Sequence, residues 1–390
     1  MFLNPNITPK SSWLNIGVLS AGHFVGDFYS NILPVMLPIL ALQFGLSFSE
    51  CGLLFMIFQV SASLLQAPIG IAADNKNLGL IFPLSILFGG VLCSLVGLSS
   101  SVLMLVCIVG LSGICQSGFH PIAGGMVPSL APKGKTVLAT SIFIVCGNIG
   151  FAISPFITAI YLKHFEQQEL WYLAIFPILI TLLIFKQKLY TRPVAKTNGK
   201  NVSLKIILAN KPFLYLVASI GCRSICYCAL VLYIPLLFTS KGISSVSSSA
   251  ILMTMLIGTA IGGLAVGGLA SKFRLKTMII CSYILTTVMM IVFLIKADDS
   301  LISYISIFFA GVGLYGSTPP AIVWAQRLLP KADSFATSMM LGFTFGIGYS
   351  SCVFVGLLGD LIGLHQALWY SIIASLLGAI AIIIKVKEKN

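Results

Sequence analysis

Charge is what this sequence has least of. Only 8% of its 390 residues are charged, about a third of the roughly 25% that is usual in soluble domains. So few charges cannot form a surface that faces water, and 58% hydrophobic residues are more than one core can bury. The composition therefore excludes a soluble enzyme and predicts that much of the surface faces lipid.

The signatures of several other protein classes are also missing. The sequence has no GxxxxGK[ST] phosphate loop and no GxSxG nucleophile motif. Its ten cysteines form no pair of CxxC motifs and no cluster with histidine at zinc spacing, so they are expected to pack in apolar runs. Ten-residue strands of alternating polarity are absent too. We therefore predict no enzyme, no ATP-driven pump, no resident metal and no cofactor.

Long apolar stretches dominate what is present. Polar loops that contain glycine or proline separate twelve stretches of roughly 17–25 residues, the length of a membrane-spanning helix. The first, from Trp13 to about Gly45, is too long for a signal peptide and has no cleavage site, so it is expected to be retained. The sequence thus predicts an all-α polytopic membrane protein, with spans that begin near residues 13, 48, 78, 102, 136, 168, 211, 246, 276, 301, 332 and 365.

The basic residues predict the orientation of these spans. Twelve spans place both termini on one side, and this side then carries most of the 23 lysines and arginines. Because cytoplasmic loops are rich in Lys and Arg, we expect both termini in the cytoplasm, in the inner membrane of a bacterium. The net charge of +13 then reflects topology, and no nucleic-acid partner is expected.

One basic segment divides the chain into two halves. Residues 186–211 contain seven basic and no acidic side chains, together with Pro193 and Gly199. We expect a six-helix bundle at 1–187, a flexible cytoplasmic linker at 188–210 and a second bundle at 211–390. Alternatively, the linker binds a partner protein or anionic lipid headgroups.

The two halves are related by an internal repeat. Gly70-Ile-Ala-Ala-Asp74 matches Gly268-Leu-Ala-Ser-Lys272 at an offset of 198 residues, and Pro132-Lys133 matches Pro330-Lys331 at the same offset. Pro38-x6-Gly45-Leu-Ser likewise matches Pro235-x6-Gly242-Ile-Ser at an offset of 197. An offset that stays at 197–198 residues over separate helix pairs indicates parallel repeats, which place a substrate site near the middle of the membrane.

These features resemble the major facilitator superfamily over nearly the whole chain. The Gly70-x-x-x-Asp74 segment resembles its loop motif between helices two and three, and Gly147-Asn-Ile-Gly150-x4-Pro155 is similar to its antiporter motif. The resemblance implies the major facilitator fold of two pseudo-symmetric six-helix bundles, which works by alternating access. It also implies gating roles for Gly70, Asp74, Gly147, Gly150 and Pro155.

Within the superfamily, three segments resemble the fosmidomycin-resistance branch of drug efflux proteins. They are Gly22-His23-Phe24-Val25-x-Asp27, Gly118-Phe119-His120-Pro121 and Arg223-Ser224. Helix four has Gly113 where many drug antiporters carry an arginine, three residues before Gln116. The resemblance to this branch implies efflux.

Two charged residues lie deep within apolar spans. A charge at the bilayer centre costs on the order of 2.5–3.5 kcal/mol or more, so it needs a partner or a wet cavity. Asp27 and Arg223 both lie near mid-span, and the repeat offset maps Asp27 one position from Arg223. We therefore expect these two side chains to form a pair across a central cavity.

Other polar residues follow the two charges at helical spacing. His23 precedes Asp27 by four residues, and Gln116 precedes His120 by four, so each pair shares one helix face. Tyr227 follows Arg223 in the same way. We expect Asp27, His23 and His120 to couple transport to protons. The alternative is structural: the charged pair only holds two helices together, and each histidine bonds a backbone carbonyl.

Arg223 is the expected anchor for a carboxylate or phosphonate, because guanidinium binds such groups well. Tyr227 and Trp324 are expected to add aromatic surface, while Gln116 and Asn148 are weaker candidates for which helix packing is the alternative. The sequence therefore predicts a monomeric, proton-coupled transporter in the lipid bilayer, driven by the proton gradient. It would export a small anionic or zwitterionic drug or metabolite by antiport. The alternative is proton-linked uptake of an organic anion or of a metal chelator such as a siderophore.

Overall fold

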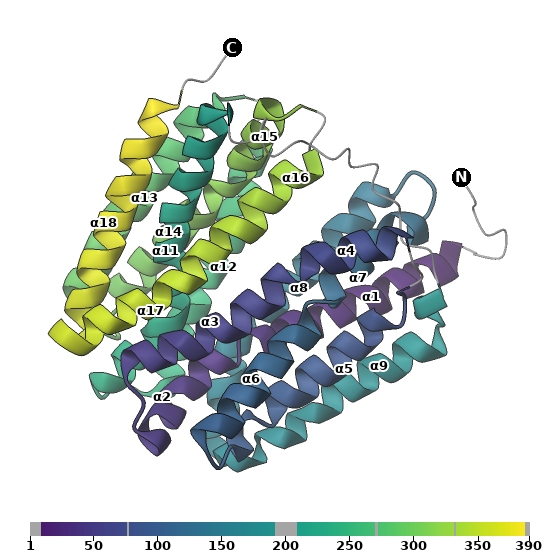
Figure 1. The fold of residues 1–390 in the computed structure, drawn as a ribbon, viewed down its shortest axis with the longest axis horizontal. Coiled ribbons are helices and arrows are strands. Elements are labelled where there is room, and N and C mark those ends of the chain that lie inside the picture. Colours follow the sequence, from purple (N-terminus) through teal and green to yellow (C-terminus); the bar gives the residue numbers. More distant parts are fainter. Residues whose placement is uncertain (1–8, 76–77, 192–208, 270–271, 331–332, 387–390) are drawn as a thin grey trace. The chain divides into compact units, whose positions relative to one another are not determined.

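A computed structural model describes residues 9–75, 78–191, 209–269, 272–330 and 333–386, in some of which only the backbone is placed. These residues form helices and connecting loops (Figure 1). Twelve helical segments are long and apolar enough to span a membrane, which confirms the predicted all-α fold and the predicted number of spans. Their bounds are Ser12–Phe44, Phe48–Gly70, Ile81–Leu98, Val102–Leu130, Thr136–His164, Gln167–Lys186, Lys211–Ser240, Ser245–Leu269, Leu275–Lys296, Leu301–Leu328, Phe335–Ile362 and Leu364–Lys385.

The first six spans contain several broken helices. The first span is α1 followed by α2, and the second and fourth are broken as well. The helices are α1 (Pro9–Ser30), α2 (Leu33–Phe44), α3 (Phe48–Leu64), α4 (Gln66–Asn75), α5 (Ile81–Ser94), η1 (Val96–Leu98), α6 (Val102–Gln116), α7 (Phe119–Leu130), α8 (Thr136–His164), η2 (Gln167–Ala174), α9 (Ile175–Lys186) and η3 (Leu189–Thr191). Helix α1 packs against α5, α7, α8 and α9.

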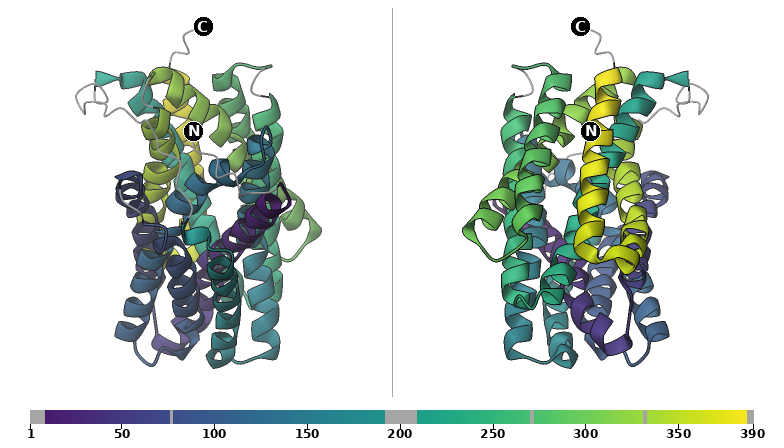
Figure 2. Two further views of the ribbon diagram at one scale, coloured as in Figure 1. Left: turned by 90° about the vertical axis from the view of Figure 1, so that its right-hand side faces the viewer. Right: turned by 90° about the vertical axis from the view of Figure 1, so that its left-hand side faces the viewer.

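The last six spans are built around α11, which contacts α12, α15, α17 and α18. Figure 2 shows these helices, coloured from teal to yellow, from two further sides. A π-helical turn, η4, interrupts the eleventh span. The helices are α11 (Lys211–Ser240), α12 (Ser245–Leu269), α13 (Leu275–Lys296), α14 (Leu301–Gly316), α15 (Thr318–Leu328), α16 (Asp333–Ser338), η4 (Met339–Phe343), α17 (Thr344–Ile362) and α18 (Leu364–Lys385).

Contacts divide the chain into two compact units, residues 1–36 with 57–197 and residues 37–56 with 198–390. Segment 37–56 groups with the second unit because α17 holds the start of α3. Asp360 accepts hydrogen bonds from the backbone N–H groups of Phe48 at 2.7 Å and Ser49 at 3.1 Å, and a carboxylate stabilises a helix N-terminus. The division into 1–187, 188–210 and 211–390 stays a prediction, and residues 192–208 of the linker lie outside the described residues.

The internal repeat is visible as repeated packing. In the first unit α1 packs on α8 and α9, and in the second unit α11 packs on α17 and α18. Gly45 and Gly242, which the repeat pairs, both follow a helix end with positive φ angles of 66° and 75°, a conformation in which glycine carries no steric penalty. Gly118 lies against Ser85 in the first unit, and its equivalent Gly316 lies against Ser282 in the second.

The fourth and tenth spans break at equivalent positions. Helix α6 ends at Gln116 and α7 begins at Phe119, while α14 ends at Gly316 and α15 begins at Thr318. A proline lies in the first turn of α7 and of α15, where its missing N–H costs little. Helix breaks inside membrane spans expose backbone groups and helix ends at mid-membrane depth, where binding sites of transporters are commonly found.

Candidate functional site

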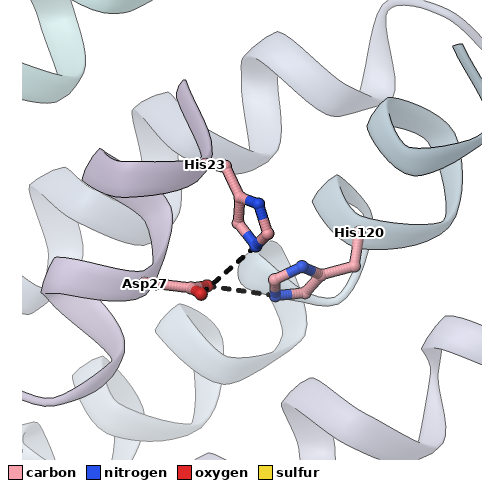
Figure 3. Close-up of side chains that lie close together, drawn as sticks. All are labelled: His23, Asp27 and His120. Carbon is pink, nitrogen blue, oxygen red and sulfur yellow. Dashed lines mark ion pairs between the residues drawn. The ribbon is translucent and has the colours of Figure 1, made fainter. Parts of the chain in front are cut away.

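A carboxylate and two imidazoles meet in the first unit (Figure 3). His23 and Asp27 lie one turn apart on α1, and Nε2 of His23 is 3.2 Å from Oδ2 of Asp27. The i, i+4 spacing places both side chains on one helix face. Their side chains are 10% and 15% exposed, so this pair is largely but not completely buried.

His120 approaches the same carboxylate from the first turn of α7. Its Nε2 lies 3.4 Å from Oδ1 of Asp27, and its side chain is 38% exposed, the most open of the three. The three side chains that the sequence predicts to act together thus lie in one place. Their role stays a prediction.

The hydrogen bonds of His23 require an extra proton in this cluster. Nδ1 of His23 is 2.8 Å from the carbonyl oxygen of Phe143, which can only accept, so Nδ1 carries a hydrogen. A neutral ring would then present the lone pair of Nε2 to the carboxylate of Asp27, and the two would repel each other. The 3.2 Å contact is favourable only when a proton lies on Nε2 of His23 or on Asp27.

Helix α8 fixes the position of His23 through small residues and an aromatic ring. A Cβ atom on Gly147 would lie 2.4 Å from Nε2 of His23, and one on Gly150 would lie 2.2 Å from the carbonyl oxygen of Phe24. The ring of Phe143 packs against the imidazole of His23 with a centroid distance of 4.2 Å. The glycines predicted to act in gating thus permit α8 to contact α1 closely.

Gln116 belongs to a polar network beside the cluster. Its Oε1 accepts a hydrogen bond from Ser30 at 2.5 Å, and its Nε2 donates to Ser112 at 3.4 Å. A small cavity here is lined by His120, Gln116 and Ser30, among other residues. Its size suits about one water molecule, which would connect the exposed imidazole with the amide of Gln116.

Gly113 is required by the contact between α6 and α3. A Cβ atom there would lie 2.2 Å from Oγ of Ser61 and 2.4 Å from the carbonyl oxygen of Phe58. An arginine at this position, as in many drug antiporters, would need a different separation of these two helices. The cluster of His23, Asp27 and His120 consequently has no counterpart to that arginine.

The second unit holds a buried guanidinium. Arg223 on α11 is 0% exposed, and its Nη2 donates to Oγ1 of Thr318 at 3.4 Å. Its Cζ lies 5.4 Å from the ring centroid of Phe345, a cation–π contact. Its Nε and Nη1 have no hydrogen-bond partner within the part of the chain that the structure describes. Buried polar groups usually have a hydrogen-bond partner, and the role of Arg223 in binding an anion stays a prediction.

The repeat relates the two charged sites. An offset of 198 residues maps His120 onto Thr318, and these residues contact Asp27 and Arg223 respectively. Equivalent positions of the two repeats thus hold an acidic side chain in the first unit and a basic one in the second. Thr318 was missed by sequence reasoning, although the offset could have identified it. Phe345 was missed as well, and no sequence signal singles it out. The pair between Asp27 and Arg223 would join the two units and stays a prediction.

The remaining predicted residues occupy different surroundings. Tyr227 is 6% exposed and its ring lies 5.4 Å from that of Phe345, close to Arg223. Trp324, 2% exposed, packs in the apolar core of the second unit, whereas Asn148 is exposed on α8. The structure thus brings Tyr227 to Arg223 but places Trp324 among core side chains.

The other predicted gating residues are Gly70, Pro155 and Asp74. Gly70 lies near Pro121, with 3.4 Å from a Cβ position to the proline ring, while Pro155 is buried inside α8. The side chain of Asp74 lies outside what the structure describes.

Comparison with known proteins shows the family of this chain. The Major Facilitator Superfamily matches residues 19–350. The chain is 25% identical to the fosmidomycin resistance protein of Escherichia coli over 90% of this chain and 87% of that protein. It is 22% identical to the probable 4-methylmuconolactone transporter of Cupriavidus pinatubonensis over 89% of this chain and 84% of that protein.

Solved structures show the same fold. The nucleoside transporter NupG superposes with a TM-score of 0.74 at 14% identity, covering 97% of this chain and 100% of that one. A bacterial homologue of the human lysosomal transporter Spinster, inward-facing and occupied, gives a TM-score of 0.75 at 15% identity over 98% of this chain and 95% of that one. At these identities the likeness concerns the fold alone.

Proposed function

The chain belongs to the Major Facilitator Superfamily of secondary transporters, which are not enzymes, and from this premise we propose that it is a proton-coupled antiporter. It would export a small anionic or zwitterionic drug or metabolite by alternating access. The observation that carries the proposal is the geometry of His23, whose Nδ1 lies 2.8 Å from the carbonyl oxygen of Phe143 while its Nε2 lies 3.2 Å from Oδ2 of Asp27. A transport cycle can load and release a proton at such a site, because the contact is favourable in one protonation state and unfavourable in the other.

Competition between proton and substrate is what antiport requires. His120 is the most exposed member of the cluster and lines the small cavity beside Gln116. A substrate group that contacts His120 would directly affect the proton of the cluster. Export also agrees with the name of the Escherichia coli relative, a fosmidomycin resistance protein.

The substrate is proposed to be anionic because of Arg223. Its unpartnered Nε and Nη1 atoms would donate to a carboxylate or phosphonate, and Tyr227 would add an aromatic surface beside Phe345. Guanidinium stays charged throughout the physiological pH range. We therefore assign anion binding to the second unit and proton binding to the first.

Proton-linked uptake is the second candidate function, and this separation of charges favours it. An anion on Arg223 and a proton on the cluster of the first unit occupy different groups, so both can bind together. Simultaneous binding is the linkage of a symporter. Its substrate would be an organic anion or a metal chelator such as a siderophore.

Proteoliposomes with an imposed proton gradient test the function and separate the two candidates. With radiolabelled fosmidomycin as probe, an antiporter accumulates the compound against the direction of proton flow, and a symporter accumulates it with that flow. A pH-sensitive dye inside the vesicles reports the protons. Substrate flux that is unchanged when the gradient is collapsed contradicts proton coupling altogether.

Both termini are proposed to face the cytoplasm of a bacterium, in its inner membrane, and the protein is proposed to act as a monomer. The excess of Lys and Arg in the loops of that side supports this orientation. Fusing alkaline phosphatase or green fluorescent protein to the C-terminus tests the orientation, because the first is active only outside the cytoplasm and the second fluoresces inside it. Phosphatase activity at the C-terminus would contradict the assignment.

A further inference from the structure

We propose that His23, Asp27 and His120 form a binding site for a divalent transition-metal ion of the type of Zn²⁺. This inference concerns the cluster to which the proposed function assigns the proton. Among the described residues, these three are the group of metal-ligand side chains whose donor atoms lie within 4.8 Å of one another. Two imidazole nitrogens and a carboxylate oxygen are a ligand set that Zn²⁺ commonly has.

The geometry of the donors suits a metal. His23 and Asp27 are four residues apart on one helix, the spacing by which helical metal sites present two ligands on one face. Nε2 of His23 lies 3.2 Å from Oδ2 of Asp27, and Nε2 of His120 lies 3.4 Å from Oδ1, so each imidazole approaches a different oxygen of the carboxylate. Bonds of about 2.0–2.1 Å to a tetrahedral Zn²⁺ separate neighbouring ligand atoms by about 3.3 Å, and the three donors would have to turn toward one common point to bind it.

The orientation of His23 is set as in a metal ligand. Its Nδ1 donates to the carbonyl oxygen of Phe143 at 2.8 Å, which leaves Nε2 to face the other two donors. Ligating histidines usually make this second bond, because it fixes the ring and its tautomer. Gly147 leaves no room for the ring to move toward α8. A Zn²⁺ ion would also remove the repulsion between the Nε2 lone pair and the carboxylate.

The site is not sealed within the first unit. His120 is 38% exposed and lines the cavity with Gln116 and Ser30. A structural zinc site has four protein ligands, whereas three ligands leave a position for water or for a group of a bound molecule. The metal would therefore occupy the cluster in place of the proton and hold His120 against α1.

Binding of Zn²⁺ to purified protein tests the proposal. Isothermal titration is performed in detergent, without substrate or gradient, after N-ethylmaleimide has blocked the accessible thiols. We expect one equivalent of Zn²⁺ in the wild type, and a loss of affinity of at least about tenfold in His120→Ala and in Asp27→Asn. His365→Ala is the matched control, because that imidazole bonds the carbonyl of Leu294 in the second unit.

A second pair of variants guards against effects of misfolding. His120→Glu supplies a carboxylate ligand of similar reach and should retain Zn²⁺, whereas His120→Gln has a similar length, supplies no charged ligand and should lose it. Equal affinity in this pair, or no binding by the wild type, overturns the metal site. If Zn²⁺ does not bind but flux depends on the proton gradient, the metal proposal fails and the proposed function stands. If Zn²⁺ binds but flux is independent of the gradient, the metal site stands and the proposed function fails.

Discussion

A methyl group on Gly147 would lie 2.4 Å from Nε2 of His23. Helix α8 therefore closes over the imidazole, and the carbonyl of Phe143 on the same helix bonds its Nδ1 at 2.8 Å. The ring cannot turn away without losing this bond, so its Nε2 stays directed at Asp27. The glycine of α8 is thus a positioning residue for the cluster on α1.

Gly147→Ala should displace the imidazole of His23 and lower proton-linked flux by about tenfold, the size of effect that loss of a positioning contact has. Flux is measured in proteoliposomes with a pH-sensitive dye. Gly124→Ala is the matched control, because nothing lies within 4 Å of a Cβ atom there. Equal flux in both variants would show that the ring does not depend on α8.

Asp27→Asn should abolish the pH dependence of transport while exchange of substrate continues. The amide carries no negative charge, so it can neither take up a proton nor stabilise one on the two imidazoles, and binding of the proton would no longer be coupled to this carboxylate. Initial rates at several pH values check this. Asp299→Asn, in the loop before α14, is the control and should keep the wild-type profile. A pH dependence that persists in Asp27→Asn would move proton coupling to another residue.

Arg223→Met should weaken the binding of anions by about tenfold or more, since hydrogen bonds to a charged group contribute about 1.5–3 kcal/mol. A set of carboxylates and their matching amides, measured by thermal shift, separates loss of charge recognition from general loss of binding. Equal losses for acids and amides would contradict the anion site.

The same substitution should leave the free energy of unfolding unchanged or raise it by about 1–4 kcal/mol, because an unpaired buried charge is replaced by an apolar side chain of similar length. Arg327→Met, at an exposed position of α15, is the control for a change of net charge. A large fall in melting temperature of Arg223→Met alone would indicate a structural role.

Gly113→Ala should destabilise the first unit by about 1–3 kcal/mol, and Gly113→Arg by more, because the new atoms would overlap Ser61 and the backbone of Phe58. Gly110→Ala is the control one turn earlier, where the nearest atom lies at an ordinary 3.5 Å. Melting temperatures in detergent check both. A stable Gly113→Arg variant with increased proton coupling would show that α6 and α3 can separate.

Helix number and span limits followed from the sequence because the bilayer imposes them locally, and the repeat followed from segments that recur at a nearly constant offset. A span needs about 20 apolar residues wherever it lies in the fold, so composition alone sets its length. The link between His23 and Asp27 was equally local, since four residues along a helix always share a face.

Only the tertiary structure decided which side chains meet across helices. His120 reaches Asp27 from α7, 93 positions along the chain, and Thr318 reaches Arg223 from α15. Trp324 was a predicted binding residue that packs in a core, since its environment depends on the helices around it. Sequence periodicity gives the face of each helix, but helix packing sets the neighbours of that face, and it depends on small residues such as Gly147 and Gly113.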